Sequence, residues 1–236
     1  MKKVVIGIKL NKFISLIIFI LLIGYYCYQQ LIPNETYTLK DIPKYSNKDY
    51  VVINDNNPNF TEINTTSFQK YSELDSLGRA HEAVANLGID LMPTKKRGYI
   101  GMIKPSGFKT VKYDNIEGKY LYNRCHLIGY QLTGQNALET NLITCTRQTN
   151  TGTMLEFENK VADYIKETSN HVLYRVTPIY EGNNLIASGI QMEAYSVEDE
   201  GKGIKFNIYI YNVQDGIEIN YENGDSYQKY ELVNKK

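Results

Sequence analysis

A histidine and an arginine stand two positions apart in the segment YNRCHLIGY, residues 122–130. An imidazole titrates near neutral pH, so His126 can accept a proton from water or from a hydroxyl group. The guanidinium of Arg124 offers N–H donors in a planar fork, which suits bidentate contacts with anionic oxygens. Arg97 is a second candidate for such contacts. These residue types predict acid–base chemistry on an anionic group.

Three further polar residues follow at spacings that suit a shared site. Asn141 begins a predicted strand, Asn150 lies just before or at the start of a predicted helix, and Glu158 lies inside that helix. The neutral amide oxygen of Asn150 suits Mg²⁺, which keeps most of its waters. A histidine directly after a strand, then a second strand and a helix with Asn and Glu, form the arrangement of a ββα metal finger. In that arrangement a base and a metal ligand face one phosphate.

Each of these residues also has a simpler interpretation. An isolated strand histidine is more often structural than catalytic, and asparagine is a common helix N-cap. The helix glutamate could be a solvated side chain, and the arginine before the histidine could form a structural ion pair. The combination of NRCHL (123–127), NLIT (141–144) and Asn150 favours the catalytic interpretation. His81 and His171 lack such neighbours, so we expect them to be structural.

These motifs resemble the DNA/RNA non-specific endonuclease family of ββα-metal nucleases, over residues 41–227. The likeness is greatest to its Gram-positive branch, which includes membrane-anchored nucleases through which competent bacteria take up DNA. The segments that carry it are DLMPTKKRG (90–98), KPSGF (104–108), YNRCHLIGYQLTG (122–134), NLIT (141–144), TR (146–147) with Asn150, and YSVEDEGKGI (195–204).

The resemblance implies a role for each candidate residue. His126 corresponds to the general base, Asn150 to the single side-chain ligand of one Mg²⁺ ion, and Glu158 to the acid that holds metal-bound water. Mn²⁺ is expected to substitute for Mg²⁺. Asn141 matches a second asparagine near the site, while Arg124 and Arg97 would contact phosphate oxygens.

The implied function is sequence-non-specific hydrolysis of phosphodiester bonds in DNA, with RNA as a second candidate substrate. The chain departs from the family pattern at Asn123 and Cys125, where Asp and a small residue are common, and at Cys145, where Gly is common. Neither departure removes the base or the metal ligand. The alternatives are a catalytically inactive extracellular nucleic-acid receptor and a tethered adhesion module.

The charge distribution agrees with a polyanionic substrate only locally. The formal net charge is zero, which gives no global basic signature. Residues 94–130 nevertheless carry eight basic and two acidic side chains, while residues 181–225 carry nine acidic side chains and two lysines. A local basic field can attract phosphates while acidic residues lie elsewhere, although a solvated surface would show the same pattern.

The N-terminus has the pattern of a targeting element. Four lysines precede an apolar run at residues 13–28, and no small-residue cleavage motif follows it. The pattern favours an uncleaved signal anchor in residues 1–30, a single-pass transmembrane helix with the body outside the cell. Cleavage and secretion are the alternative. Residues 31–65 are expected to be a tether and irregular lobe, and residues 66–230 the endonuclease domain.

The remaining hydrophobic patterns predict an α+β fold, in which a central antiparallel sheet accompanies the ββα finger. Helices are expected at residues 76–87 and 154–166. Strands are expected at residues 50–54, 98–103, 109–113, 119–123, 141–144, 171–180, 185–196 and 204–213. Cys125 and Cys145 either pair in an oxidising compartment or remain buried thiols.

Overall fold

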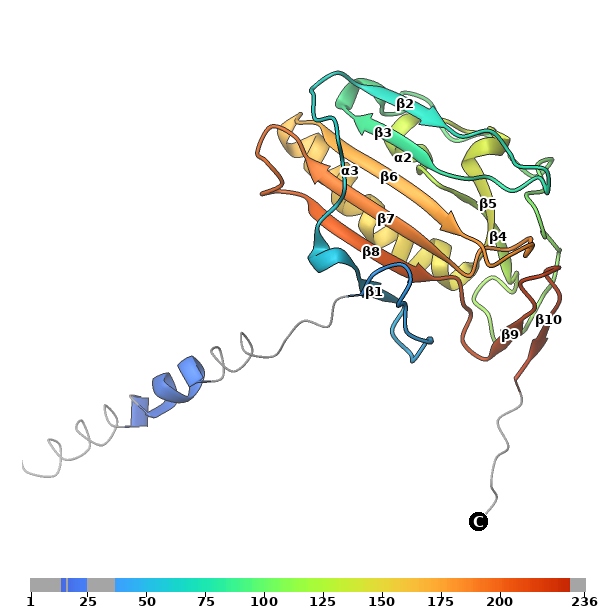
Figure 1. Ribbon diagram of the computed structural model, residues 1–236, viewed down its shortest axis with the longest axis horizontal. Helices are drawn as coiled ribbons and strands as arrows, with labels where there is room; N and C mark the ends of the chain where they lie inside the picture. Colours follow the sequence, from blue (N-terminus) through green and yellow to red (C-terminus); the bar gives the residue numbers. More distant parts are fainter. Residues whose placement is uncertain (1–13, 16, 25–36, 230–236) are drawn as a thin grey trace, which may run out of the picture. The chain divides into compact units, whose positions relative to one another are not determined.

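The computed structural model describes residues 14–15, 17–24 and 37–229 (Figure 1). The chain forms two compact units, Met1–Glu35 and Thr36–Lys236. In the first unit, residues 14–15 and 17–24 are helical and their side chains are exposed. Within the described residues, no helix combines the length and the apolar character that a membrane span requires. Residues 1–13, 16 and 25–30 of the predicted anchor lie outside that part of the chain.

The second unit is built on a six-stranded antiparallel sheet with the strand order β1-β8-β7-β6-β3-β2. The strands are β1 (Tyr50–Val52), β2 (Phe68–Tyr71), β3 (Ala83–Leu87), β6 (Val172–Ile179), β7 (Gly189–Ser196) and β8 (Lys205–Tyr211). Residues of β6, β7 and β8 follow one another along the chain and pair as neighbours, as expected for antiparallel strands joined by short loops. The predicted α+β class with a central antiparallel sheet is confirmed.

A second layer covers one face of this sheet. It contains the two-stranded antiparallel pair β4 (Tyr122–His126) and β5 (Leu142–Thr146), a π-helical turn (Thr149–Met154) and α3 (Leu155–Thr168). Figure 1 shows α3 lying behind β6, β7 and β8. Val161, Ala162 and Ile165 of α3 recur at helical spacing and are fully buried in the core that the sheet residues share.

Short elements complete the unit: the 3-10 helices Asn54–Asn56, Ile89–Leu91 and Glu139–Asn141, the helix α2 (Tyr130–Thr133), and the hairpin β9 (Ile217–Ile219) with β10 (Ser226–Gln228). The predicted tether and irregular lobe at residues 31–65 extends into this unit, because β1 pairs with β8 at the sheet edge. Tyr37 also forms a parallel bridge with Ile53.

The helix predicted at residues 76–87 is wrong. Residues Ala83–Leu87 form β3, which pairs with β2 on one side and β6 on the other. The apolar residues of this segment match a helical period, yet Gly78 has a left-handed φ of 70°. The Asp75 carboxylate accepts the backbone N–H groups of Leu77 and Arg79, which closes a turn. Sheet pairing of the following residues then overrides local helix propensity.

Two predicted strands between residues 98 and 113 are also wrong. Residues 98–103 form no strand, and in residues 109–113 only an isolated bridge from Lys112 to Tyr120 is present. The carbonyl groups of Gly101 and Ile103 are instead acceptors for the Arg124 guanidinium. A side chain thus satisfies backbone groups that a strand would otherwise pair.

A disulfide joins β4 to β5 between Cys125 and Cys145, whose Cα atoms are 5.9 Å apart. Both cysteines are fully buried in the core. The ladder between these strands has only five residue pairs, and an isolated two-stranded ladder is marginally stable. The disulfide therefore reinforces the short ladder that ends at His126.

We predict that Cys125→Ser and Cys145→Ser each lower the free energy of unfolding by roughly 3 kcal/mol, because the bridge closes a loop of 20 residues in the unfolded chain. Urea denaturation of the oxidised protein and both variants measures the loss. The double variant should lose little more than either single variant, since one crosslink is removed in each case. Unchanged denaturation midpoints in both variants would contradict a stabilising bridge.

Candidate active site

His126 is the last residue of β4 and lies opposite Leu142 of β5. Its side chain is mostly buried, and its Nε2 atom lies 2.8 Å from the backbone carbonyl oxygen of Asn136. A carbonyl can only accept a hydrogen bond, so Nε2 carries the proton of the neutral ring. The lone pair of the neutral imidazole is therefore on Nδ1. The fold thus selects the tautomer that leaves Nδ1 as the basic atom.

Arg97 lies beside this basic atom, with its Nη2 atom 3.4 Å from His126 Nδ1. Burial lowers the pKa of His126, and the positive charge of Arg97 lowers it further, while the hydrogen bond to Asn136 acts in the opposite direction. The imidazole consequently remains neutral, and able to accept a proton, at pH values below its ordinary pKa of 6.5.

Glu158 of α3 lies near Arg97 and the backbone of Gly129. Its carboxylate lies so close to Gly129 that a Cβ atom on this glycine would be 2.6 Å from Glu158 Oε2. Burial raises the pKa of Glu158 to about 8, while Arg97, Gln131 and the Gly129 backbone lower it. Glu158 is therefore a buried carboxyl group whose charge is incompletely compensated. A cation placed nearby would favour its ionised form.

Asn141 is fully buried, and its backbone carbonyl accepts the N–H of Leu127, the residue after the histidine. Its side-chain oxygen accepts the Ile128 N–H at 2.9 Å, and its amide nitrogen donates to the Ile128 carbonyl at 3.1 Å. Both polar groups of the side chain are thus engaged with the loop that follows β4. This geometry makes Asn141 a residue that positions the His126–Gly129 segment.

The Arg124 guanidinium contacts the loop at residues 101–103. It donates to the carbonyl groups of Ile103 and Gly101, the latter at 2.8 Å, and its guanidinium carbon lies 4.2 Å from the centre of the Phe108 ring. The structure therefore brings Arg97, His126 and Glu158 together, and it occupies Arg124 with the backbone of the 101–103 loop.

Asn150 lies in the π-helical turn that precedes α3, and not at a helix N-cap. Its side chain is half-buried, and no hydrogen bond within the described part of the chain engages it. Single π-helical turns are rare and frequently occur at functional sites. The amide oxygen of Asn150 is thus free for a ligand, although no contact joins it to His126 in the described residues.

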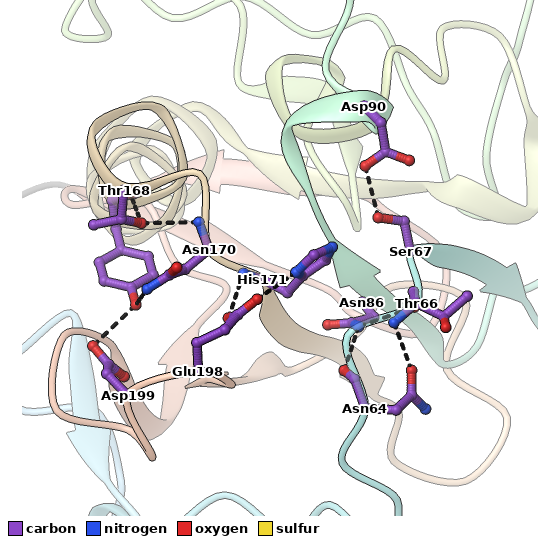
Figure 2. Close-up of polar contacts among 11 residues, drawn as sticks. Asn64, Thr66, Ser67, Asn86, Asp90, Thr168, Asn170, His171, Glu198 and Asp199 are labelled. Atoms are coloured by element: carbon purple, nitrogen blue, oxygen red, sulfur yellow. Dashed lines mark hydrogen bonds and ion pairs between the residues drawn. The ribbon is translucent and has the colours of Figure 1, made fainter.

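The other two histidines differ from His126 in their partners. His81 lies 3.1 Å from an Asp75 carboxylate oxygen, and His171 Nδ1 lies 2.6 Å from Glu198 Oε1. Figure 2 shows His171 and Glu198 among a group of polar side chains at the ends of β3 and β6. Of the three histidines, all of which the structure describes, only His126 faces a carbonyl and a guanidinium instead of a carboxylate.

The oxygen donors fit a hard divalent cation better than a soft one. Asn150 offers an amide oxygen and Glu158 a buried carboxyl group, and Mg²⁺ binds through few protein oxygens and several waters. Within the described residues, no group of three or more His, Cys, Asp or Glu side chains is arranged to hold a metal ion. The site therefore lacks the imidazole and thiolate clusters that are typical of zinc sites.

Sequence reasoning missed Asn136, whose backbone carbonyl fixes the histidine tautomer. A backbone acceptor leaves no signal in residue type. It also missed Gly129, although a glycine three residues after the histidine is compatible with a close approach of another chain segment.

Comparison with known proteins identifies the family of the chain. A family model described as DNA/RNA non-specific endonuclease matches residues 59–198. A curated protein named Deoxyribonuclease, from Streptococcus dysgalactiae subsp. equisimilis, is 33% identical over 110 residues. That match covers 44% of this chain and 32% of the relative, so the chain spans about a third of the relative's length.

Solved nuclease structures share the fold. NucA from Streptococcus agalactiae with magnesium bound superimposes with a TM-score of 0.71 at 23% identity, covering 81% of this chain and 93% of NucA. Sda1 nuclease with bound zinc superimposes with a TM-score of 0.60 at 27% identity, covering 68% of this chain and 81% of Sda1. With the family model matching more than half of its length, the chain belongs to the DNA/RNA non-specific endonuclease family.

Proposed function

We propose that the protein is a metal-dependent endonuclease that hydrolyses phosphodiester bonds of DNA, and of RNA as a second substrate, without sequence preference. One observation carries this proposal. His126 is held as the Nε2–H tautomer with its basic Nδ1 beside Arg97, close to the buried Glu158. Hydrolysis of a phosphodiester needs a base that activates water and a positive charge that stabilises the transition state.

In this mechanism His126 Nδ1 accepts a proton from the attacking water. The hydrogen bond from Nε2 to Asn136 holds the ring in place and stabilises the imidazolium as it forms. The Arg97 guanidinium is placed to donate to a phosphate oxygen near the base. Arg124 supports this region by holding the 101–103 loop, and its remaining donor capacity could also serve a phosphate.

Asn150 and Glu158 are the residues proposed to bind Mg²⁺, Asn150 directly through its amide oxygen and Glu158 through water. When bound, the cation supplies electrostatic stabilisation of the charge on the phosphate and its leaving group. Mn²⁺ shares this preference for oxygen ligands. The unengaged amide of Asn150 and the raised pKa of the Glu158 carboxyl both support a cation at this place.

We predict that His126→Ala lowers kcat roughly 10²–10⁴-fold and leaves DNA affinity nearly unchanged, because removal of the base leaves the phosphate contacts in place. Nicking of a supercoiled plasmid and binding to an uncleaved duplex measure the two effects. Added imidazole should restore part of the activity.

The wild-type enzyme should show an acidic limb of kcat/KM below pH 6.5, since the base acts in its neutral form and its pKa is lowered. Wild-type cutting by His126→Ala would refute the assignment of the base. A wild-type protein that binds DNA without cutting it would instead indicate an inactive receptor.

We predict that cutting requires Mg²⁺ or Mn²⁺, stops when EDTA is added, and is not restored by zinc alone. Asn150→Ala should reproduce the effect of metal removal, because it deletes the proposed direct ligand. Calorimetric titration of Mg²⁺ into the protein without nucleic acid separates metal binding from catalysis. Thr151→Ala is the matched control on the neighbouring, exposed position. Full activity in EDTA would contradict the metal mechanism.

We further propose that residues 13–28 anchor the protein in the cell membrane, with the nuclease unit on the extracellular side. The lysines before this apolar run and the missing cleavage motif support an anchor. Cell fractionation should then find the intact chain with the membranes, and protease added outside the cell should digest residues 37–229. A shortened N-terminus in the culture medium would favour the alternative, a secreted enzyme. An intact chain that is soluble in the cytosol would contradict both.

A further inference from the structure

Asn136 contacts two parts of the site with different atoms. Its backbone carbonyl oxygen lies 2.8 Å from His126 Nε2. Its side-chain oxygen accepts the backbone N–H of Gly98 at 3.2 Å. Gly98 directly follows Arg97 in the chain. One residue therefore holds both the base and the peptide that carries the neighbouring guanidinium.

The backbone at Gly98 is packed tightly against this amide. A Cβ atom at Gly98 would lie 2.8 Å from Asn136 Nδ2, which is closer than van der Waals contact permits. Any larger residue at position 98 must displace the Asn136 side chain or move the loop. The absence of a side chain at this position is thus a requirement of the contact.

The loop that carries Arg97 has few other attachments near the site. Residues 94–100 form no helix or strand, and most of their side chains are exposed. A second hydrogen bond runs from the Tyr130 hydroxyl to the Lys95 carbonyl at 2.7 Å. Arg97 itself reaches His126 at 3.4 Å, a long contact that small movements of the loop would break.

We infer that the Asn136 side chain is a positioning residue, which keeps the Arg97 guanidinium beside His126 Nδ1. This inference rests on the proposed function of His126 as the base. The Asn136 backbone carbonyl orients the imidazole, while the Asn136 amide fixes the distance from that imidazole to the positive charge. The two contacts make the position of Arg97 depend on the same residue that fixes the tautomer.

A displacement of Arg97 can be detected through the pKa of His126, and two charged groups matter for this pKa. Arg97 faces His126 from the 94–100 loop, and Glu158 faces Arg97 from α3. Departure of Arg97 from the ring would raise the pKa of His126, because a nearby positive charge disfavours the imidazolium. Loss of the carbonyl contact would have the opposite effect, because that hydrogen bond raises the pKa. The direction of the change thus identifies which contact was broken.

The test is a pH titration of His126 by NMR, using full-length, metal-free protein with isotope-labelled histidine. Asn136→Ala retains the backbone carbonyl and deletes the amide, and Gly98→Ala breaks the same contact from the other side. Both variants should shift the His126 titration to higher pH. Gln135→Ala is the control, since no hydrogen bond within the described residues engages the Gln135 side chain.

Measurements of kcat/KM and of double variants provide a second test of the contact between Asn136 and Gly98. Asn136→Ala and Gly98→Ala should each lower kcat/KM on the order of tenfold to a hundredfold, as expected for a misplaced group near the reacting atoms. The double variant Asn136→Ala/Gly98→Ala should lose no more kcat/KM than Asn136→Ala alone. The deleted amide leaves room for the methyl group that Gly98→Ala adds. In an Arg97→Ala background, Asn136→Ala should cause no further shift of the His126 titration.

An unchanged or downward shift of the titration in both folded single variants would overturn the inference. An equal upward shift with Arg97 already removed would overturn it as well. Gly98→Ala keeps the test available if Asn136→Ala does not fold. The titration does not depend on nuclease activity, so an inactive wild-type protein would refute the proposed function without affecting this measurement.

Discussion

The chemistry of the site depends on the hydrogen bond from His126 Nε2 to the Asn136 carbonyl oxygen. A neutral imidazole has one donor and one acceptor, so fixing the donor also fixes the atom that can take a proton. Here the acceptor is a backbone group in the segment between α2 and β5. The remaining contacts keep this arrangement in place. Asn141 bonds both polar groups of the Ile128 backbone, and the bridge from Cys125 to Cys145 joins the two strands at the position before the histidine.

Around this bond, burial favours the uncharged forms of both His126 and Glu158, and the positive charge of Arg97 adds to this effect at His126 but opposes it at Glu158. Arg97 and burial favour the neutral imidazole, while burial of Glu158 disfavours its carboxylate. In the metal-free protein the site therefore holds a neutral base and a carboxyl group that gains from a nearby cation. The fold also places the local positive charge next to the base, even though the whole chain has no net charge.

The second strand and the helix of the site were predicted nearly correctly from the sequence, whereas the strand expected at residues 119–123 lies at Tyr122–His126 as β4 and includes the histidine. Residues of β5 and α3 follow clear alternating or helical periods, and the motif at residues 122–130 pointed to His126. The β3 strand could not be predicted, because its Ala, Val and Leu residues fit both periods and its pairing partner β6 lies far along the chain. The strand predicted at residues 98–103 does not form. The carbonyl groups that a neighbouring strand would pair are instead satisfied by a side chain, Arg124. The role of the Asn136 carbonyl could not be predicted, because every residue type carries the same backbone oxygen. Only the folded conformation brings this oxygen to His126.

The most direct test of this account is the tautomer of His126 in the metal-free protein, measured by long-range ¹H–¹⁵N NMR at neutral pH. We expect a neutral ring with the proton on Nε2 and an unprotonated Nδ1, as the carbonyl contact requires. A ring protonated on Nδ1, or an imidazolium at neutral pH, would contradict it. Either result would mean that Nδ1 is not available as the base, whatever activity the protein shows.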